Sequence, residues 1–191
     1  MRKFYPVLFT MLLCLFLAHT VSSQNMTGEM SSSSPSLVKL TAGDLQGTSG
    51  KIISLADAMP AEDYKWRPME GVRSVSEVYV HVALTNYFIL SYCGVKMPDN
   101  LKPGSENTDL EKTITGKKDV MEFLKKSFVA TQKFLNNYDG ADLNTMVKLP
   151  FGKFSKAQLL TILTGHAHEH LGQSIAYARM NKVVPPWSRK H

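Results

Sequence analysis

Three of the six histidines lie close together, at His166, His168 and His170. The sequence around them, from Leu159 to Tyr177, has the apolar spacing of one amphipathic helix. At roughly 100° per residue, His166 and His170 fall on the same line as the leucines of this helix, and His168 falls on the opposite side. Two imidazoles are therefore expected to point into the protein. Because a buried histidine pair is costly without a binding partner, a metal ion is the simplest candidate.

Two histidines four residues apart on one helical face are spaced so that both rings can bind the same ion. The zinc-protease form of this pair requires a glutamate directly after the first histidine, where this chain has Ala167. Glu169 lies roughly 80° off the line of the pair, so the protease interpretation is rejected. A third ligand is required. His81 is the remaining histidine that lies inside an expected helix, although a histidine at the margin of a helical face is more often a hydrogen-bonded core residue than a ligand.

Four helices must position these histidines. The apolar spacing predicts them over residues of about 40–59, 74–93, 117–138 and 155–181. Ser74 with Glu77, and Ser155 with Gln158, form capping boxes that begin the second and fourth helices. Residues 95–116 are rich in Pro, Gly, Asn and Asp, which indicates a long surface connection that can form a wall of a pocket. The predicted fold class is all-α: a four-helix, up-and-down-type bundle with a long loop between helices 2 and 3.

The N-terminus has the features of a secretory signal peptide over residues 1–23, with a short basic start and an apolar run from Val7 to Ala18. An uncleaved membrane anchor is the alternative, although the run is short for a bilayer span of ~20 residues. The serine-rich residues 24–38 are expected to be a flexible linker, and residues 39–187 a single metal-binding domain. The expected location is therefore periplasmic or secreted, without membrane attachment after cleavage.

The charge argues against a nucleic-acid-binding protein, and the cysteine content argues against a fold stabilised by internal disulfides. The formal net charge is +6, of which Arg2 and Lys3 of the leader supply two. The excess is small and spread along the chain, which argues against nucleic acid as a partner. Without the leader, Cys93 is the one cysteine left, so no internal disulfide can form. Core packing or a metal ion must then stabilise the fold of an exported protein.

Two blocks of sequence carry a resemblance to a known family. The first is Tyr64-Lys65-Trp66-Arg67-Pro68, then Gly71-Val72-Arg73-Ser74-Val75, Glu77 and His81; the second is His166-x-x-x-His170-Leu171-Gly172-Gln173, then Tyr177-Ala178-Arg179 and a Pro-Pro tail. In this order and spacing they resemble the DinB-like (DinB/YfiT-like) metalloprotein superfamily over residues 40–187. The resemblance implies a four-helix bundle with a divalent metal held by His81, His166 and His170. Family members are often dimers, so a homodimer is a further expectation.

Three histidine ligands leave a fourth metal position open, which is typical of catalytic zinc sites. Zinc is the expected metal, and nickel, iron or manganese would also suit histidine ligands. Such a metal lowers the pKa of a bound water or thiol. Because characterised relatives include transferases that use small thiols, the resemblance implies a metal-dependent thiol S-transferase acting on a small-molecule substrate.

Candidate catalytic residues are Gln173, one turn after His170, and Asn86 on the second helix. Glu77 lies four residues before His81 and is a candidate to orient it, with the capping role as the simpler interpretation. Two other functions remain open. One is a non-catalytic, extracytoplasmic metal-binding or stress-response module, and the other is a metal-dependent hydrolase.

Overall fold

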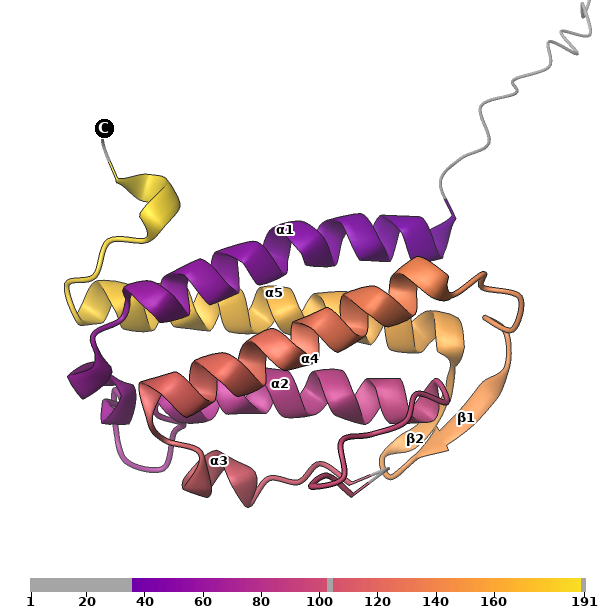
Figure 1. Cartoon of the computed structure of the whole chain (residues 1–191), viewed down its shortest axis with the longest axis horizontal. Coiled ribbons are helices and arrows are strands. Elements are labelled where there is room, and N and C mark those ends of the chain that lie inside the picture. Colours follow the sequence, from indigo (N-terminus) through magenta and orange to yellow (C-terminus); the bar gives the residue numbers. More distant parts are fainter. Residues whose placement is uncertain (1–35, 103–104, 190–191) are drawn as a thin grey trace, which may run out of the picture. The chain divides into compact units, whose positions relative to one another are not determined.

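The structure is a computed structural model, and it describes residues 36–102 and 105–189. The predicted signal peptide, residues 1–23, and residues 24–35 of the predicted linker lie outside the described residues. Four long helices dominate the described part (Figure 1): α1 (Leu37–Ala58), α2 (Val75–Tyr92), α4 (Lys117–Asn137) and α5 (Lys156–Met180). The shorter elements are η1 (Ala61–Lys65), α3 (Leu110–Thr113), β1 (Met146–Leu149), β2 (Gly152–Ser155) and η2 (Pro186–Ser188).

The four long helices form a bundle in which α1 and α2 each pack against α4 and α5. The predicted all-α fold with a long loop after the second helix is therefore confirmed. Figure 1 shows that α2 and α4 run in the same direction, whereas α1 and α5 run in the opposite one. The expected up-and-down order, in which consecutive helices are antiparallel, is thus broken between α2 and α4. Parallel neighbours require a connection that returns along the whole bundle, and residues 93–116 provide it.

Helices α2 and α5 begin where the capping boxes predict. The Ser74 hydroxyl accepts a hydrogen bond from the backbone N–H of Glu77, and the Glu77 carboxylate accepts one from the backbone N–H of Ser74 at 2.8 Å. Ser155 and Gln158 make the same reciprocal pair. Each box satisfies two N–H groups that the first turn of a helix leaves unpaired. The boxes also fix where each helix begins, and so which side chains face the core.

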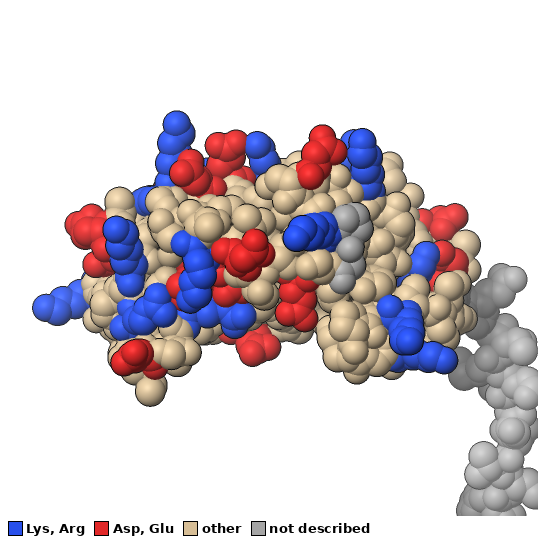
Figure 2. All heavy atoms as spheres, turned by 90° about the horizontal axis from the view of Figure 1, so that it is seen from below, with Lys and Arg blue, Asp and Glu red and all other residues tan. Residues whose placement is uncertain are grey.

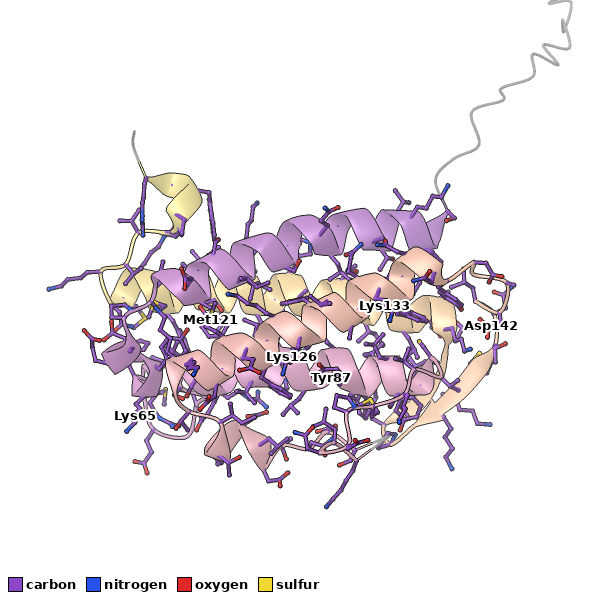
Figure 3. The ribbon with its side chains drawn as sticks, viewed as in Figure 1. Lys65, Tyr87, Met121, Lys126, Lys133 and Asp142 are labelled. Atoms are coloured by element: carbon purple, nitrogen blue, oxygen red, sulfur yellow. The ribbon has the colours of Figure 1, made fainter. Side chains whose placement is uncertain are left out.

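The inward faces of the helices form one continuous apolar core. Its largest fully buried side chains include Tyr64, Tyr79, Leu45, Ile52, Leu124, Leu159 and Leu160. Lysines lie on the outer side of α4, where Lys126 and Lys133 are exposed (Figure 3). Within the described ranges, no helix is both long enough and apolar enough to span a bilayer.

A β-hairpin separates α4 from α5. β1 and β2 pair antiparallel, with Leu149 opposite Gly152, so that Pro150 and Phe151 form the turn. A Cβ atom at Gly152 would lie 3.0 Å from the ring of Phe154, which explains the glycine. The turn places the Phe151 ring against Phe88 of α2, with 6.3 Å between the ring centroids.

Candidate metal centre

The structure brings His81, His166 and His170 together between α2 and α5. His81 lies in the second turn of α2, and the other two lie one turn apart on α5. The ring centroid of His81 lies 4.9 Å from the centroid of His166 and 4.9 Å from that of His170. The centroids of His166 and His170 lie 4.3 Å from each other. One nitrogen of each ring is within 4.8 Å of the other two. In the described part of the chain, this is the one group of three or more His, Cys, Asp or Glu residues arranged to hold a metal ion.

Two neighbouring side chains fix which ring nitrogens face the centre of the cluster. His81 Nδ1 donates to Oε1 of Glu111 at 2.9 Å, since an ionised carboxylate can only accept. His170 Nδ1 donates to Oε1 of Gln173 at 2.7 Å. In a neutral imidazole the other nitrogen, Nε2, then carries the free lone pair. Both rings are therefore held in the tautomer that offers Nε2 as a metal ligand.

Glu111 is a buried carboxylate, 5% exposed, and it comes from α3 within the long connection. Besides His81, it accepts hydrogen bonds from Arg73, at 2.7 Å to Oε2 and 3.2 Å to Oε1. Burial acts to raise the pKa of Glu111, but the hydrogen bonds from His81 and Arg73 outweigh burial and hold that pKa below its ordinary value. The Glu111 carboxylate thus stays ionised and continues to accept the hydrogen bond from Nδ1 of His81.

Burial keeps the α5 histidines neutral. It lowers the pKa of His166 to about 3, and the neighbouring His170 and His81 act in the same direction. Burial also lowers the pKa of His170, although the hydrogen bond to Gln173 opposes the shift. Metal ions bind the neutral imidazole, so protons compete weakly for these two ligands near neutral pH.

The donor set fits a divalent metal ion. His81 Nε2 and His166 Nε2 lie 3.0 Å apart. Two nitrogens that bind one tetrahedral zinc at about 2.0 Å lie about 3.3 Å apart, so only a small adjustment is required. Three imidazole nitrogens, two of them on rings with a fixed tautomer, could therefore hold such an ion.

Two cavities flank the cluster. The first, of about 220 Å³, is lined by His81 and His166 together with mostly apolar side chains of α2, α5 and the hairpin. The second, of about 510 Å³, is polar, and its lining includes Arg67, Arg73, Lys112, Glu77, Glu111 and Gln173. Acidic and basic side chains are interspersed on the face of the molecule that Figure 2 shows. The cluster therefore lies between an apolar and a charged environment.

The two predicted catalytic candidates have different surroundings. Gln173 lies at the cluster, where it accepts from His170 and donates to the hydroxyl of Tyr177 at 3.1 Å. Asn86 does not reach the cluster: it is 1% exposed and donates to Ser127 of α4 at 3.1 Å. Five residues along a helix correspond to roughly 140° of rotation from His81, which turns Asn86 toward the core between α2 and α4.

His168 lies away from the cluster, on the outer surface between α5 and α1. Its Nε2 donates to Asp44 at 2.9 Å and lies 3.2 Å from the hydroxyl of Thr48. Glu77 caps α2 and accepts hydrogen bonds from Arg67 at 3.0 Å and Lys112 at 2.8 Å. The orienting role considered for Glu77 at His81 belongs instead to Glu111.

Sequence reasoning missed two residues that contact the cluster. Glu111 had no local signal, because it lies in the connection and meets His81 only through the tertiary fold. Thr85 has its hydroxyl 3.3 Å from Nε2 of His166. Its position one turn after His81 on α2 was a signal that could have identified it.

Comparisons with known proteins concern the family and the fold of the chain. Residues 45–174 match the model of the DinB superfamily. Among solved structures, a DinB-like protein from Bacillus cereus has a TM-score of 0.62 at 21% identity, covering 75% of this chain and 94% of that one. A DinB-like protein from Bacillus subtilis has a TM-score of 0.56 at 16% identity, covering 80% and 99%. A conserved protein from Enterococcus faecalis has a TM-score of 0.60 at 14% identity, covering 77% and 98%.

A search of the curated proteins found no significant match. The structural neighbours are less than 25% identical to this chain and support the fold alone. The family model covers more than half of the sequence, including His81, His166 and His170. The chain belongs to the DinB superfamily.

Proposed function

We propose that this member of the DinB superfamily binds one divalent metal ion through Nε2 of His81, His166 and His170, and that it transfers a small thiol to an electrophilic substrate. The observation that carries the proposal is the convergence of three imidazole nitrogens within 4.8 Å beside a cavity. Zinc is the proposed metal, because three histidines with an open position are the usual ligands of catalytic zinc.

Glu111 and Gln173 each have a defined part in this proposal. Glu111 and Gln173 hold the Nδ1 protons of His81 and His170, so that both Nε2 lone pairs stay available. When bound, the metal supplies a Lewis acid that lowers the pKa of a thiol reaching it. The thiol loses its proton to solvent and its sulfur bonds to the electrophilic carbon of the substrate. The leaving group departs with the bonding electron pair.

The apolar cavity on one side of the cluster favours a thiol over water as the reactant. Leu84 and Phe88, 3% and 4% exposed, form part of the cavity beside His81 and His166. An apolar wall stabilises few ordered water molecules, because a bound water needs two to four polar partners. A sulfur atom on an apolar group loses less solvation than water when it enters such a cavity.

Cobalt substitution tests both parts of the proposal. The protein is loaded with Co²⁺, its metal content is measured by mass spectrometry, and its visible spectrum is recorded while 2-mercaptoethanol is added. We expect one metal ion per chain and a new sulfur-to-cobalt absorption band. His166→Ala should lose the metal, whereas the control His168→Ala should keep it, because His168 bonds to Asp44 and not to the cluster.

The alternative functions give different results in the same experiment. A spectrum that 2-mercaptoethanol leaves unchanged, combined with slow ester or amide hydrolysis, would favour a metal-dependent hydrolase. Metal binding with neither response would favour a non-catalytic module. Wild-type protein without stoichiometric metal would refute the proposal. Export is part of the same proposal, and mass spectrometry of protein recovered outside the cytoplasm, with a new N-terminus near Gln24, would support it.

A further inference from the structure

We propose that the 220 Å³ cavity beside the cluster is a specificity pocket for an uncharged, apolar group about the size of one aromatic ring, and that Phe151 at the tip of the hairpin forms its outer wall. This inference rests on the proposed function, because the group is taken to belong to the molecule that reacts at the histidine cluster. The pocket itself consists of side chains of this chain.

The walls of the pocket come from four separate parts of the fold. Helix α2 supplies Leu84, Phe88 and Ile89, which are 1–4% exposed. Helix α5 supplies Ile162, one turn before His166. The remaining walls are Phe151 of the hairpin and Glu106 of the long connection. Five of these six side chains are apolar, so the favourable contribution of the pocket is burial of apolar surface.

The volume limits the size of the occupant. An apolar cavity of about 150 Å³ in a protein interior takes up benzene. A volume of about 220 Å³ therefore accommodates one ring with a short substituent. Pockets for drug-sized ligands begin at about 300 Å³, so a dinucleotide or a folded peptide is too large.

The charges around the pocket favour a group without negative charge. Glu106 is the one carboxylate in the lining, and Arg73 and Lys112 line the second cavity instead. The Thr85 hydroxyl lies beside His166 and is a polar group of the lining next to the cluster. No lysine or arginine lines this pocket, so away from the metal position an anionic group would face the Glu106 carboxylate without a basic side chain to balance it.

Phe151 is suited to contact the occupant. It is 59% exposed, which is unusual for a phenylalanine, and it is held by two rings. Phe88 stacks on it at 6.3 Å, and Phe154 meets it edge to face at 5.5 Å. These two ring contacts hold the Phe151 ring in place at the pocket before a ligand arrives. A bound apolar group would cover ring surface that water now contacts.

Two uncharged thiols, one with an aromatic ring and one with a small polar hydroxyethyl group, test this assignment. Benzyl mercaptan and 2-mercaptoethanol are titrated into the cobalt-loaded protein, and both dissociation constants are read from the sulfur-to-cobalt band. We expect benzyl mercaptan to bind at least about tenfold more tightly, because its ring is buried. Phe151→Ala should reduce this preference by about threefold or more, and Ile162→Trp, which fills the pocket, should abolish it. Val129→Ala, at another exposed apolar residue, should leave it unchanged.

A second measurement does not depend on thiol chemistry. Benzyl alcohol is added to the metal-loaded protein, and the methyl NMR signals of Leu84, Ile89 and Ile162 are followed. We expect these signals to shift in the wild-type protein, and the signals of Leu84 and Ile89 to stop shifting in Ile162→Trp. Equal affinity for the two thiols, or no shift of the three methyl groups, would overturn the pocket and leave the metal site standing. Shifts without any thiol binding to cobalt would support the pocket and refute thiol transfer.

Discussion

Replacing Glu111 with glutamine should weaken metal binding without changing the size of the side chain. The carboxylate accepts from His81 through one oxygen, 2.9 Å away, and from Arg73 through both oxygens. A glutamine has one acceptor oxygen and one amide donor. If the oxygen faces His81, the amide group opposes the donor of Arg73. If the amide group faces His81, it forces the other tautomer, in which Nε2 carries a proton and cannot bind metal.

The size of the effect follows from the loss of a buried partner of a metal ligand. Such partners contribute about 10- to 100-fold in metal affinity, equivalent to about 1.4–2.7 kcal/mol. The dissociation constant can be measured by competition with a chromophoric zinc chelator at neutral pH. We expect the metal to remain bound at high concentration and to be removed by chelator concentrations that leave the wild-type protein loaded.

Glu77→Gln is the matched control. Glu77 is also a buried carboxylate with two cationic partners, but it caps α2 and makes no bond to His81. This change should lower the thermal midpoint, because it weakens the charged hydrogen bonds from Arg67 and Lys112, and it should alter metal affinity by less than about threefold. Wild-type affinity in Glu111→Gln, or equal losses in the two variants, would contradict the assignment of Glu111 as the residue that orients His81.

Three further predictions follow from the same structure. His166→Ala and His170→Ala should each abolish stoichiometric metal, whereas His168→Ala should retain it, as metal content by mass spectrometry would show. The metal-free protein should lose about 1 kcal/mol of stability per pH unit as pH falls below 6.5, because the unfolded chain protonates His166 near 6.5 and the folded chain only near about 3. That stability is fully present above pH 6.5, and urea unfolding at several pH values would measure its loss. The loss should be smaller in His166→Gln, where His170, whose pKa burial also lowers, remains. Ser155→Ala should destabilise the fold by about 1 kcal/mol in the same urea assay, because it removes the N-cap of α5.

Local sequence patterns were sufficient for the helices and for the inward-facing histidines. The capping boxes at Ser74 and Ser155 depend on residues three positions apart, and both form as predicted. The 3.6-residue period placed His166 and His170 on one face and His168 on the other, because within a helix direction is fixed by residue number. His81 meets His166 and His170 only because α2 and α5 pack together. The family resemblance implied this packing, and the periodicity within each helix did not.

The features that were missed depend on contacts between distant segments. Glu111 lies in a segment whose composition indicates a surface loop, yet it is buried because Arg73 and His81 bind it. Asn86 lies on the second helix as predicted, but its side chain bonds to Ser127 of α4 and does not point toward α5 and the cluster. The direction of α4 relative to α2 is likewise set by how the helices pack, and apolar spacing within one helix carries no information about its neighbours.

The parallel arrangement of α2 and α4 and the composition of the site have one common cause. Because both helices start at the same end of the bundle, the chain must return along its length between them (Figure 1). That return brings Glu106 to the apolar cavity and Glu111 to His81. A short loop, as in an up-and-down bundle, would leave both positions without a side chain from this segment. Metal affinity and substrate choice should therefore both respond to changes in residues 105–113, a segment that contributes little to the helical core.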